Sequence, residues 1–219
     1  MKTIDGYTVD RVLFDHSPLT ADEGNPFLLS GTMAAKVAEV VVVNPNVKQG
    51  AAYRIGGLTV GAGESANGSL CLPWYNAPRY EFGFKFKLPH PDADILSFNF
   101  NLDFEDGVNN RRFRFVLDSN YGVDNTYQYF SSVGIMTDIP TFASLWRKQE
   151  LWYQLRVVAD FSVNTWKVIE LNDLRLVGSA LNTVGGGTLP YINISLVVDI
   201  AAITTVHFYL DRFYCYALR

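Results

Sequence analysis

Two acidic residues, Asp103 and Glu105, lie two positions apart in the run of residues 98–105, where apolar and polar side chains alternate. In a strand, residues two positions apart project from the same face. Two carboxyl groups about 5–5.5 Å apart act as the acid and the nucleophile in retaining glycoside cleavage. Asp103 and Glu105 are therefore candidate catalytic residues of a glycoside hydrolase or lyase.

The same two acids also fit a structural role. Arg112 and Arg114 follow after a turn at Asp106, on a strand expected to return beside residues 98–105. Cross-strand pairs of opposite charge stabilise antiparallel sheets, and structural ion pairs are commoner than active sites. We therefore prefer to interpret Asp103 and Glu105 as members of a charge ladder.

A polar sheet face of this kind also suits a sugar, because hydroxyl groups need hydrogen-bond donors and acceptors together. The residues expected to share the face are Lys85, Lys87, Asn99, Asn101, Asp103, Glu105, Arg112 and Arg114. The predicted ligand-binding residues among them are Asn99, Asn101, Arg112 and Arg114.

A sugar site also needs an exposed aromatic ring against the apolar face of the sugar. The candidate rings are Trp74, Trp146, Tyr127 and Tyr129. Most of the 15 Phe, 12 Tyr and 4 Trp residues are expected to pack in the core.

Other motifs predict no further site. His90, Asp92 and Asp94 alternate in a loop, but their spacing matches no zinc site and calcium needs about 6–8 oxygen ligands. We interpret them as a solvated turn. Residues 61–66 resemble a dinucleotide fingerprint, but Asn67-Gly68 follows instead of the helix that would hold a pyrophosphate. No serine or cysteine has a recognisable histidine partner.

Antiparallel strands must position all of these groups. Residues 152–173 form two runs rich in β-branched and aromatic residues around a short polar turn, and residues 80–88 alternate aromatic and polar side chains. Further strands are expected at residues 55–60, 69–72, 98–105, 112–115, 127–130, 191–198 and 206–216. Residues 34–40 are interpreted as a strand, and residues 141–148 as a short helix. The pattern predicts an all-β fold, a single antiparallel β-sandwich spanning residues 1–219 with at most one or two short helices.

Composition limits the function classes. The net charge of −4 leaves no general basic field, so we expect no nucleic-acid partner. No run approaches the ~18–20 apolar residues of a membrane helix, so we expect no membrane partner. Acidic residues near the N-terminus replace the apolar segment of a secretory leader, which predicts a cytoplasmic protein. Cys71 and Cys215 are interpreted as ordinary thiols, with a single bridge left open.

The hairpin of residues 152–173 resembles a recurring element of concanavalin-like and laminin-G-like jelly rolls: Trp, alternating apolar residues, Asp, a polar turn and a second strand ending in Asn-Asp. Residues 206–216 are similar to the strand that closes many of these sandwiches. The resemblance implies a jelly-roll sandwich. Its members include lectins, carbohydrate-binding modules, glycoside hydrolases and domains of unknown role, so fold alone does not determine function.

The resemblance also bears on single residues. Glycosidases of this fold often carry two glutamates flanking an aspartate, and Asn101 stands where the first acid of that motif belongs. In some similar jelly rolls an acid in the closing strand helps to hold a structural calcium with N-terminal residues. Asp211, Asp15 and Glu23 are the candidate ligands, although a hydrogen-bonded structural role is preferred for Asp211.

The sequence therefore predicts non-catalytic carbohydrate recognition. One alternative is a glycoside hydrolase or lyase that uses Asp103 and Glu105. The other alternative is an assembly protein that forms a homo-oligomer through sheet edges or exposed aromatic rings.

Overall fold

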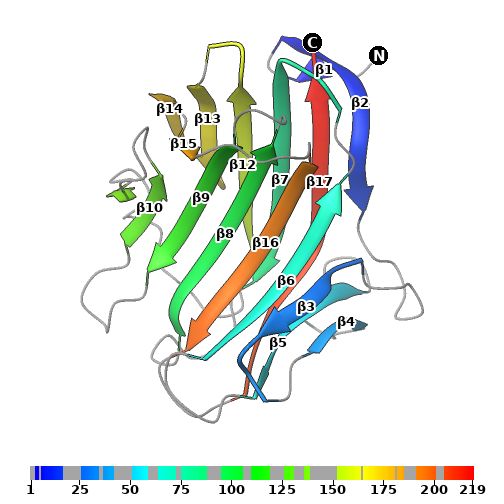
Figure 1. The fold of residues 1–219 in the computed structure, drawn as a ribbon, viewed down its shortest axis with the longest axis vertical. Coiled ribbons are helices and arrows are strands. Elements are labelled where there is room, and N and C mark those ends of the chain that lie inside the picture. Colours follow the sequence, from blue (N-terminus) through cyan, green and yellow to red (C-terminus); the bar gives the residue numbers. More distant parts are fainter. Residues whose placement is uncertain are drawn as a thin grey trace.

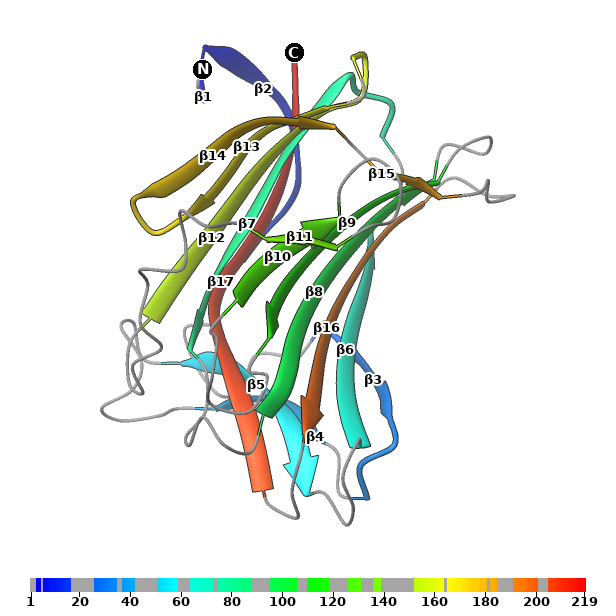
Figure 2. The same ribbon diagram turned by 90° about the vertical axis from the view of Figure 1, so that its left-hand side faces the viewer.

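Two antiparallel sheets face each other in the computed structural model (Figures 1 and 2). The structure describes the backbone of residues 3–4, 6–16, 26–34, 37–41, 51–58, 64–72, 75–87, 95–105, 110–118, 126–130, 136–138, 152–163, 165–180, 182–184, 191–200 and 205–219. Side chains are described for residues 6–16, 26–34, 39–40, 51–57, 64–72, 75–87, 152–163, 165–175 and 209–219.

The first sheet, called the β7 sheet below, has β7 (Arg79–Lys87) near its centre. Its strand order is β1 (Thr3–Ile4), β2 (Tyr7–His16), β17 (Thr205–Leu218), β7, β12 (Trp152–Asp160), β13 (Thr165–Leu171) and β14 (Leu174–Ala180). The first half of β17 also pairs with β5 (Ala52–Leu58), which in turn pairs with β4 (Val37–Val41).

The second sheet, called the β8 sheet, is built around β8 (Ile95–Glu105). Its strand order is β11 (Met136–Asp138), β10 (Thr126–Phe130), β9 (Asn110–Asp118), β8, β16 (Tyr191–Ile200), β6 (Glu64–Leu72) and β3 (Leu28–Gly31). The short strand β15 (Asn182–Val184) pairs with β9.

The main core lies between the sheets. Alternate residues of β7 (Tyr80, Phe82, Phe84 and Phe86) are at most 1% exposed and pack in one cluster with Leu70 and Leu72 of β6 and residues of β12, β13 and β17. The rings of Phe86 and Tyr153 stack with centroids 5.5 Å apart. The period-two alternation thus directs one face of β7 into the interior, as predicted.

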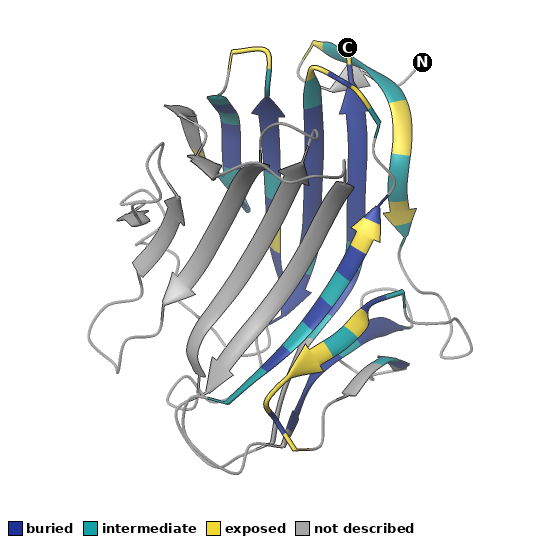
Figure 3. Ribbon diagram, in the orientation of Figure 1, coloured by how far each residue is buried: buried dark blue, intermediate teal, exposed yellow. Residues whose placement is uncertain are grey.

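Most residues on the outer face of β7 and β17 are also buried, and both strands are coloured mainly as buried in Figure 3. A second apolar cluster there contains Val158, Val168, Tyr214, Tyr216 and Leu218, with Tyr7 and Val9 packed against it. Four charged residues, Glu81, Lys87, Asp160 and Asp211, are only 2–4% exposed. A sheet buried on both faces must satisfy its polar groups internally, and this condition shapes the site described below.

The predicted all-β class and its antiparallel sheets are confirmed, and the described residues contain no helix. The segment interpreted as a strand, residues 34–40, overlaps β4 (Val37–Val41). The expected helix at residues 141–148 lies outside the described residues. Cys71 is an exposed free thiol and Cys215 a buried one, so they are not bridged. Within the described residues, no helix is long and apolar enough to cross a membrane.

One predicted grouping is wrong. Lys85 and Lys87 were expected to share a polar face with Asn99, Asn101, Asp103, Glu105, Arg112 and Arg114, but β7 belongs to one sheet and β8 and β9 to the other. Residues 80–87 and 98–105 have the same alternation but belong to different sheets. Periodicity predicts which residues of a strand share a face, but it does not assign strands to sheets.

Candidate functional site

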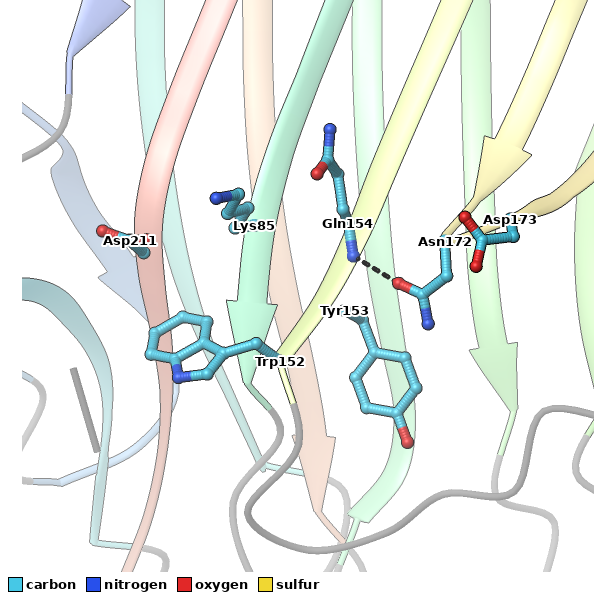
Figure 4. A pocket seen from close by; sticks show the side chains of 7 residues that line it. All are labelled: Lys85, Trp152, Tyr153, Gln154, Asn172, Asp173 and Asp211. Carbon is cyan, nitrogen blue, oxygen red and sulfur yellow. Dashed lines mark hydrogen bonds between the residues drawn. The ribbon is translucent and has the colours of Figure 1, made fainter. Parts of the chain in front are cut away.

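A pocket of about 280 Å³ opens on the outer face of the β7 sheet (Figure 4). It is lined by Lys85 of β7, Trp152, Tyr153 and Gln154 of β12, Asn172 and Asp173 of the β13–β14 turn, and Asp211 of β17. The lining thus comes from three neighbouring strands and the turn that follows β13.

The strand register brings the first group of lining residues together. Lys85 pairs with Gln154, and Lys87 pairs with Trp152. Because directly paired residues of an antiparallel sheet lie on the same face, Lys85, Gln154 and Trp152 all belong to the outer face. The indole of Trp152 extends from β12 toward β17, near Lys85 and Asp211 (Figure 4). Tyr153 points the other way, and its ring forms part of the core.

The β13–β14 turn supplies the second side of the pocket. Leu171 pairs with Leu174, so Asn172 and Asp173 are the two turn residues. Asn172 has a φ of 54°, a conformation that Asn adopts more readily than most residues. Its amide N–H donates to the Gln154 carbonyl at 2.8 Å, and its side-chain Oδ1 accepts from the Gln154 N–H at 2.9 Å. These two bonds hold the turn against β12.

A β-bulge in β17 supplies the third side. Leu210 pairs with Phe86 and Arg212 pairs with Lys85, so Asp211 is the extra residue. Bulges re-aim side chains and are common next to functional sites. Leu210 and Phe213 therefore both remain in the core, while Asp211 lines the pocket.

Arg212 ties the bulge to β2. Its Nε and Nη2 donate to the two carboxylate oxygens of Asp15 at 2.9 and 2.8 Å, and its guanidinium lies 5.1 Å from the ring centroid of Tyr214. Arg212 also donates to the Tyr216 hydroxyl at 3.0 Å, and that hydroxyl donates to Asp15. The hydrogen bond to Asp15 raises the pKa of Arg212. A planar, bidentate pair of this type fixes orientation as well as charge.

A buried ion network continues along the face. Arg156 donates to both oxygens of Glu81 at 3.2 Å and to Glu170 at 2.9 Å. Burial and the adjacent Glu81 carboxylate raise the pKa of Tyr214, so its phenol remains protonated and bonds to Glu81. The Tyr214 and Tyr216 rings stack at 5.0 Å. This packed network lies beside the pocket on the same sheet.

The described lining combines an indole, two carboxamides, two carboxylates and an ammonium group. The indole offers an apolar flat surface, and the polar groups offer both donors and acceptors. Polyhydroxylated ligands with one apolar face match this combination. Among the described lining residues there is neither a serine nor a histidine.

The predicted charge ladder lies on the other sheet. The register pairs Asp103 with Arg112, Asn101 with Arg114, and Glu105 with Asn110. Asp103 also pairs with Asn193 of β16. The opposition of Asp103 and Arg112 thus agrees with the ladder interpretation, whereas Glu105 is opposite an amide. The side chains of all these residues lie outside the described part of the structure.

None of the predicted aromatic platforms is among the lining residues that the structure describes. Tyr127 and Tyr129 belong to β10, where they pair with Leu117 and Phe115 of β9. Gln128, between them, pairs with Val116, which in turn pairs with Asn99 of β8. Their side chains lie outside the described part. Trp74 and Trp146 lie wholly outside the described residues.

The predicted calcium ligands are not gathered in the described part of the chain. Asp15 is occupied by Arg212 and Tyr216, Asp211 lines the pocket, and Glu23 lies outside the described residues. Among the residues with described side chains, no group of three or more His, Cys, Asp or Glu side chains surrounds a common point.

Sequence reasoning missed Trp152, Gln154, Asn172 and Asp173 as site residues. A signal for the pocket was nevertheless present: Asp211 and Arg212 are consecutive polar residues between the apolar pairs Tyr209-Leu210 and Phe213-Tyr214. Two adjacent polar positions interrupt the alternation of a strand, and a bulge is the structural device that accommodates such an interruption.

The sequence matches no protein-family profile and no curated protein sequence. Solved structures do match. The chain is similar to the lectin UEA-II complexed with galactose (8% identity, TM-score 0.57, covering 95% of this chain and 99% of that one). It is also similar to the carbohydrate recognition domain of Emp46p (11% identity, TM-score 0.57, covering 94% of this chain and 96% of that one). A third match is the carbohydrate esterase vb_24B_21 from the Shiga toxin-encoding bacteriophage phi24B (14% identity, TM-score 0.55, covering 97% of this chain and 99% of that one).

These identities are low, so the similarity concerns the fold. It extends over nearly the whole of each chain, far beyond the two segments on which the sequence resemblance depended. The chain therefore has the antiparallel β-sandwich fold of concanavalin-like lectins.

Proposed function

We propose that this protein is a carbohydrate-binding domain and that the sugar occupies the pocket on the outer face of the β7 sheet. The observation that carries the proposal is the lining itself, in which the indole of Trp152 extends toward Asp211 and shares the pocket with the polar side chains of Lys85 and Gln154. The lectin-like fold is consistent with this role but does not locate the site.

The physical basis is the two-sided nature of a sugar ring. Its C–H groups pack against an aromatic face, while its hydroxyl groups donate and accept hydrogen bonds around the rim. The pocket is open, about 280 Å³, and the ion pairs of Arg156 and Arg212 fix the strands beside it. Little ordering of the protein is therefore needed on binding, which preserves affinity.

Binding, rather than hydrolysis, is the function that we propose. One similar structure is named a carbohydrate esterase, but the described lining of this pocket contains no serine or histidine that would form an acyl-transfer site. The proposal places the ligand on the β7 sheet, away from Asp103 and Glu105 of β8.

A glycan array with the intact chain tests the proposal, followed by titration of the best glycans. Trp152→Ala should weaken binding at least about tenfold, equivalent to about 1.4 kcal/mol. Lys85→Ala should also weaken it, because hydrogen bonds to charged groups contribute about 1.5–3 kcal/mol.

Lys167→Ala is the matched control for Lys85→Ala. Lys167 lies on the outer face of β13, 4.0 Å from Asp160 and outside the pocket lining. Its loss should leave glycan affinity unchanged. Wild-type protein that binds no glycan, or glycan binding that survives Trp152→Ala at full strength, would contradict the proposal. Thermal denaturation of each variant separates loss of binding from loss of folding.

A further inference from the structure

Lys85, one of the lining residues, is half-buried, and its ammonium makes no hydrogen bond or ion pair in the part of the chain that the structure describes. The residues paired with Lys85 are Gln154 on β12 and Arg212 on β17, so neither of these neighbours is an acid. A lysine ammonium has only N–H donors and no acceptor. A ligand atom that meets Lys85 must therefore accept a hydrogen bond.

The side chain of Asn172, also half-buried, offers the pocket a donor as well. Its Oδ1 accepts the backbone N–H of Gln154 at 2.9 Å, and turning the carboxamide over would place its NH₂ group against that N–H instead. The orientation of the carboxamide is therefore fixed. Figure 4 shows the nitrogen of Asn172 pointing away from the bond to Gln154. This NH₂ group can donate to a ligand but cannot accept from it.

Acceptors are less accessible than donors in the described lining. Oδ1 of Asn172 is engaged, and Asp211 is only 2% exposed. Asp173 and Gln154 also offer acceptors, but both residues are exposed to water, which competes for them. A sugar hydroxyl that accepts from Lys85 or Asn172 brings a hydrogen that needs an acceptor of its own, whereas a carbonyl oxygen brings none. The two half-buried donors therefore favour a carbonyl oxygen over a hydroxyl group.

Building on the proposed function, we infer that the pocket selects sugars that carry a carbonyl oxygen and that Lys85 and Asn172 supply the donors for this selection. Two kinds of sugar have such an oxygen: acetamido sugars, in a neutral amide, and uronates, in a carboxylate. The shared chemistry is an oxygen that accepts hydrogen bonds without bringing a hydrogen. The acetamido group adds a methyl group for the indole of Trp152, and the carboxylate adds a charge for the ammonium of Lys85.

The test uses methyl glycosides that differ in one group, each titrated into the intact chain and followed by NMR chemical shifts. The glycosides of glucose and galactose are the parents. In their acetamido counterparts an acetamido group replaces one hydroxyl group, and in their uronate counterparts a carboxylate replaces the CH₂OH group. At least one carbonyl-bearing probe should bind about tenfold or more tightly than its parent. The kind of probe that does so identifies the source of the carbonyl oxygen.

Asn172→Asp separates the ligand contact from the turn. An Asp carboxylate can still accept the Gln154 N–H, and Asp tolerates the left-handed backbone, so thermal stability should change little. The donor is lost, so the preference for the carbonyl-bearing probe should fall toward one. Lys85→Met keeps an apolar stem without the ammonium and should also reduce the preference, most strongly for a uronate. Lys167→Ala, outside the pocket lining, should leave the preference unchanged.

The outcomes separate this inference from the proposed function. If no carbonyl-bearing probe binds more tightly than its parent and binding still requires Trp152, carbonyl selection is refuted and carbohydrate recognition stands. A preference that survives both Asn172→Asp and Lys85→Met also refutes the inference. If no probe and no array glycan binds in a Trp152-dependent manner, the proposed function itself is refuted. Should Asn172→Asp fail to fold, the wild-type preference and Lys85→Met decide the question.

Discussion

The phenol of Tyr214 lies directly over Gly83, so closely that a β-carbon at position 83 would come within 2.6 Å of the Tyr214 hydroxyl. The same β-carbon would also lie 2.6 Å from the Leu155 carbonyl oxygen. Gly83 thus opens the space in which Tyr214 reaches Glu81 across β7. A glycine that would weaken an ordinary strand is required here by the close approach of a ring and a backbone carbonyl.

Gly83→Ala should therefore lower the free energy of unfolding by about 1–3 kcal/mol, the usual cost of overpacking. The cost arises because one of the clashing atoms is backbone and the ring is held by Glu81. Urea denaturation provides the measurement. At Gly68 a β-carbon would instead meet the terminal Cδ1 of Ile55 at 2.5 Å. Gly68→Ala should cost less, since a side-chain end shifts more easily than a carbonyl; equal costs at both positions would argue against this account.

Arg156→Met should destabilise the protein by about 3 kcal/mol, because it leaves the carboxylate of Glu81 buried without its cation. The double variant Arg156→Met with Glu81→Gln should recover part of the loss, since no isolated charge then remains. Arg175, exposed and in register with Glu170, is the matched control. Arg175→Met should change stability by less than about 0.5 kcal/mol. A double variant no more stable than the single one would contradict the buried-charge explanation.

Asp160 makes stability depend on acid pH. Burial alone would raise the pKa of Asp160, but hydrogen bonds from Ser162 and from Arg79, whose Nε lies 2.8 Å away, outweigh burial and lower it. A folded-state pKa below the unfolded value of about 3.9 means that the contribution is present above that pH and disappears as pH falls through the folded pKa.

The stability advantage of wild type over Asp160→Asn should therefore be about 1–3 kcal/mol at pH 7 and should shrink below pH 4. Denaturation at a series of pH values measures it, with Asp173→Asn, at an exposed turn, as the control. An advantage that stays constant down to pH 2 would exclude the proposed linkage.

The two thiols should differ sharply in reactivity. Burial raises the pKa of Cys215, which is fully enclosed in the core, whereas Cys71 is exposed on β6. The thiolate is the reactive form, so a disulfide reagent should modify one thiol per native chain and two in denaturant. Native Cys71→Ala protein should not react. Rapid modification of both thiols under native conditions would be incompatible with the described core.

Local patterns predicted the strands better than their arrangement. Residues 80–87 and 98–105 both lie in strands, as their alternation predicted, and in residues 80–87 the apolar positions face the core. Nothing in that alternation shows that the two strands lie in different layers, because pairing between strands depends on long-range contacts. The grouping of Lys85 with Asn101 failed for this reason.

The candidate site was harder still to predict, because it depends on irregularities. Trp152 looked like an ordinary first residue of a strand, and Asn172-Asp173 like an ordinary turn. Their proximity to Asp211 arises from the β7–β12 register and from the bulge in β17. The unusual burial of Asp211 was anticipated from the apolar residues around it, but its sharing a face with Arg212 was not, since unbroken alternation places adjacent residues on opposite faces.

Strand β7 is paired along its whole length with β12 on one side and β17 on the other, and residues on both of its faces are buried. Its amide hydrogens reach solvent only when both neighbours and both apolar clusters separate, so their exchange with deuterium should follow global unfolding. A strand with this degree of protection keeps Lys85 in place for as long as the protein is folded. The side of the pocket formed by β7 should therefore lose its shape only when the whole protein unfolds.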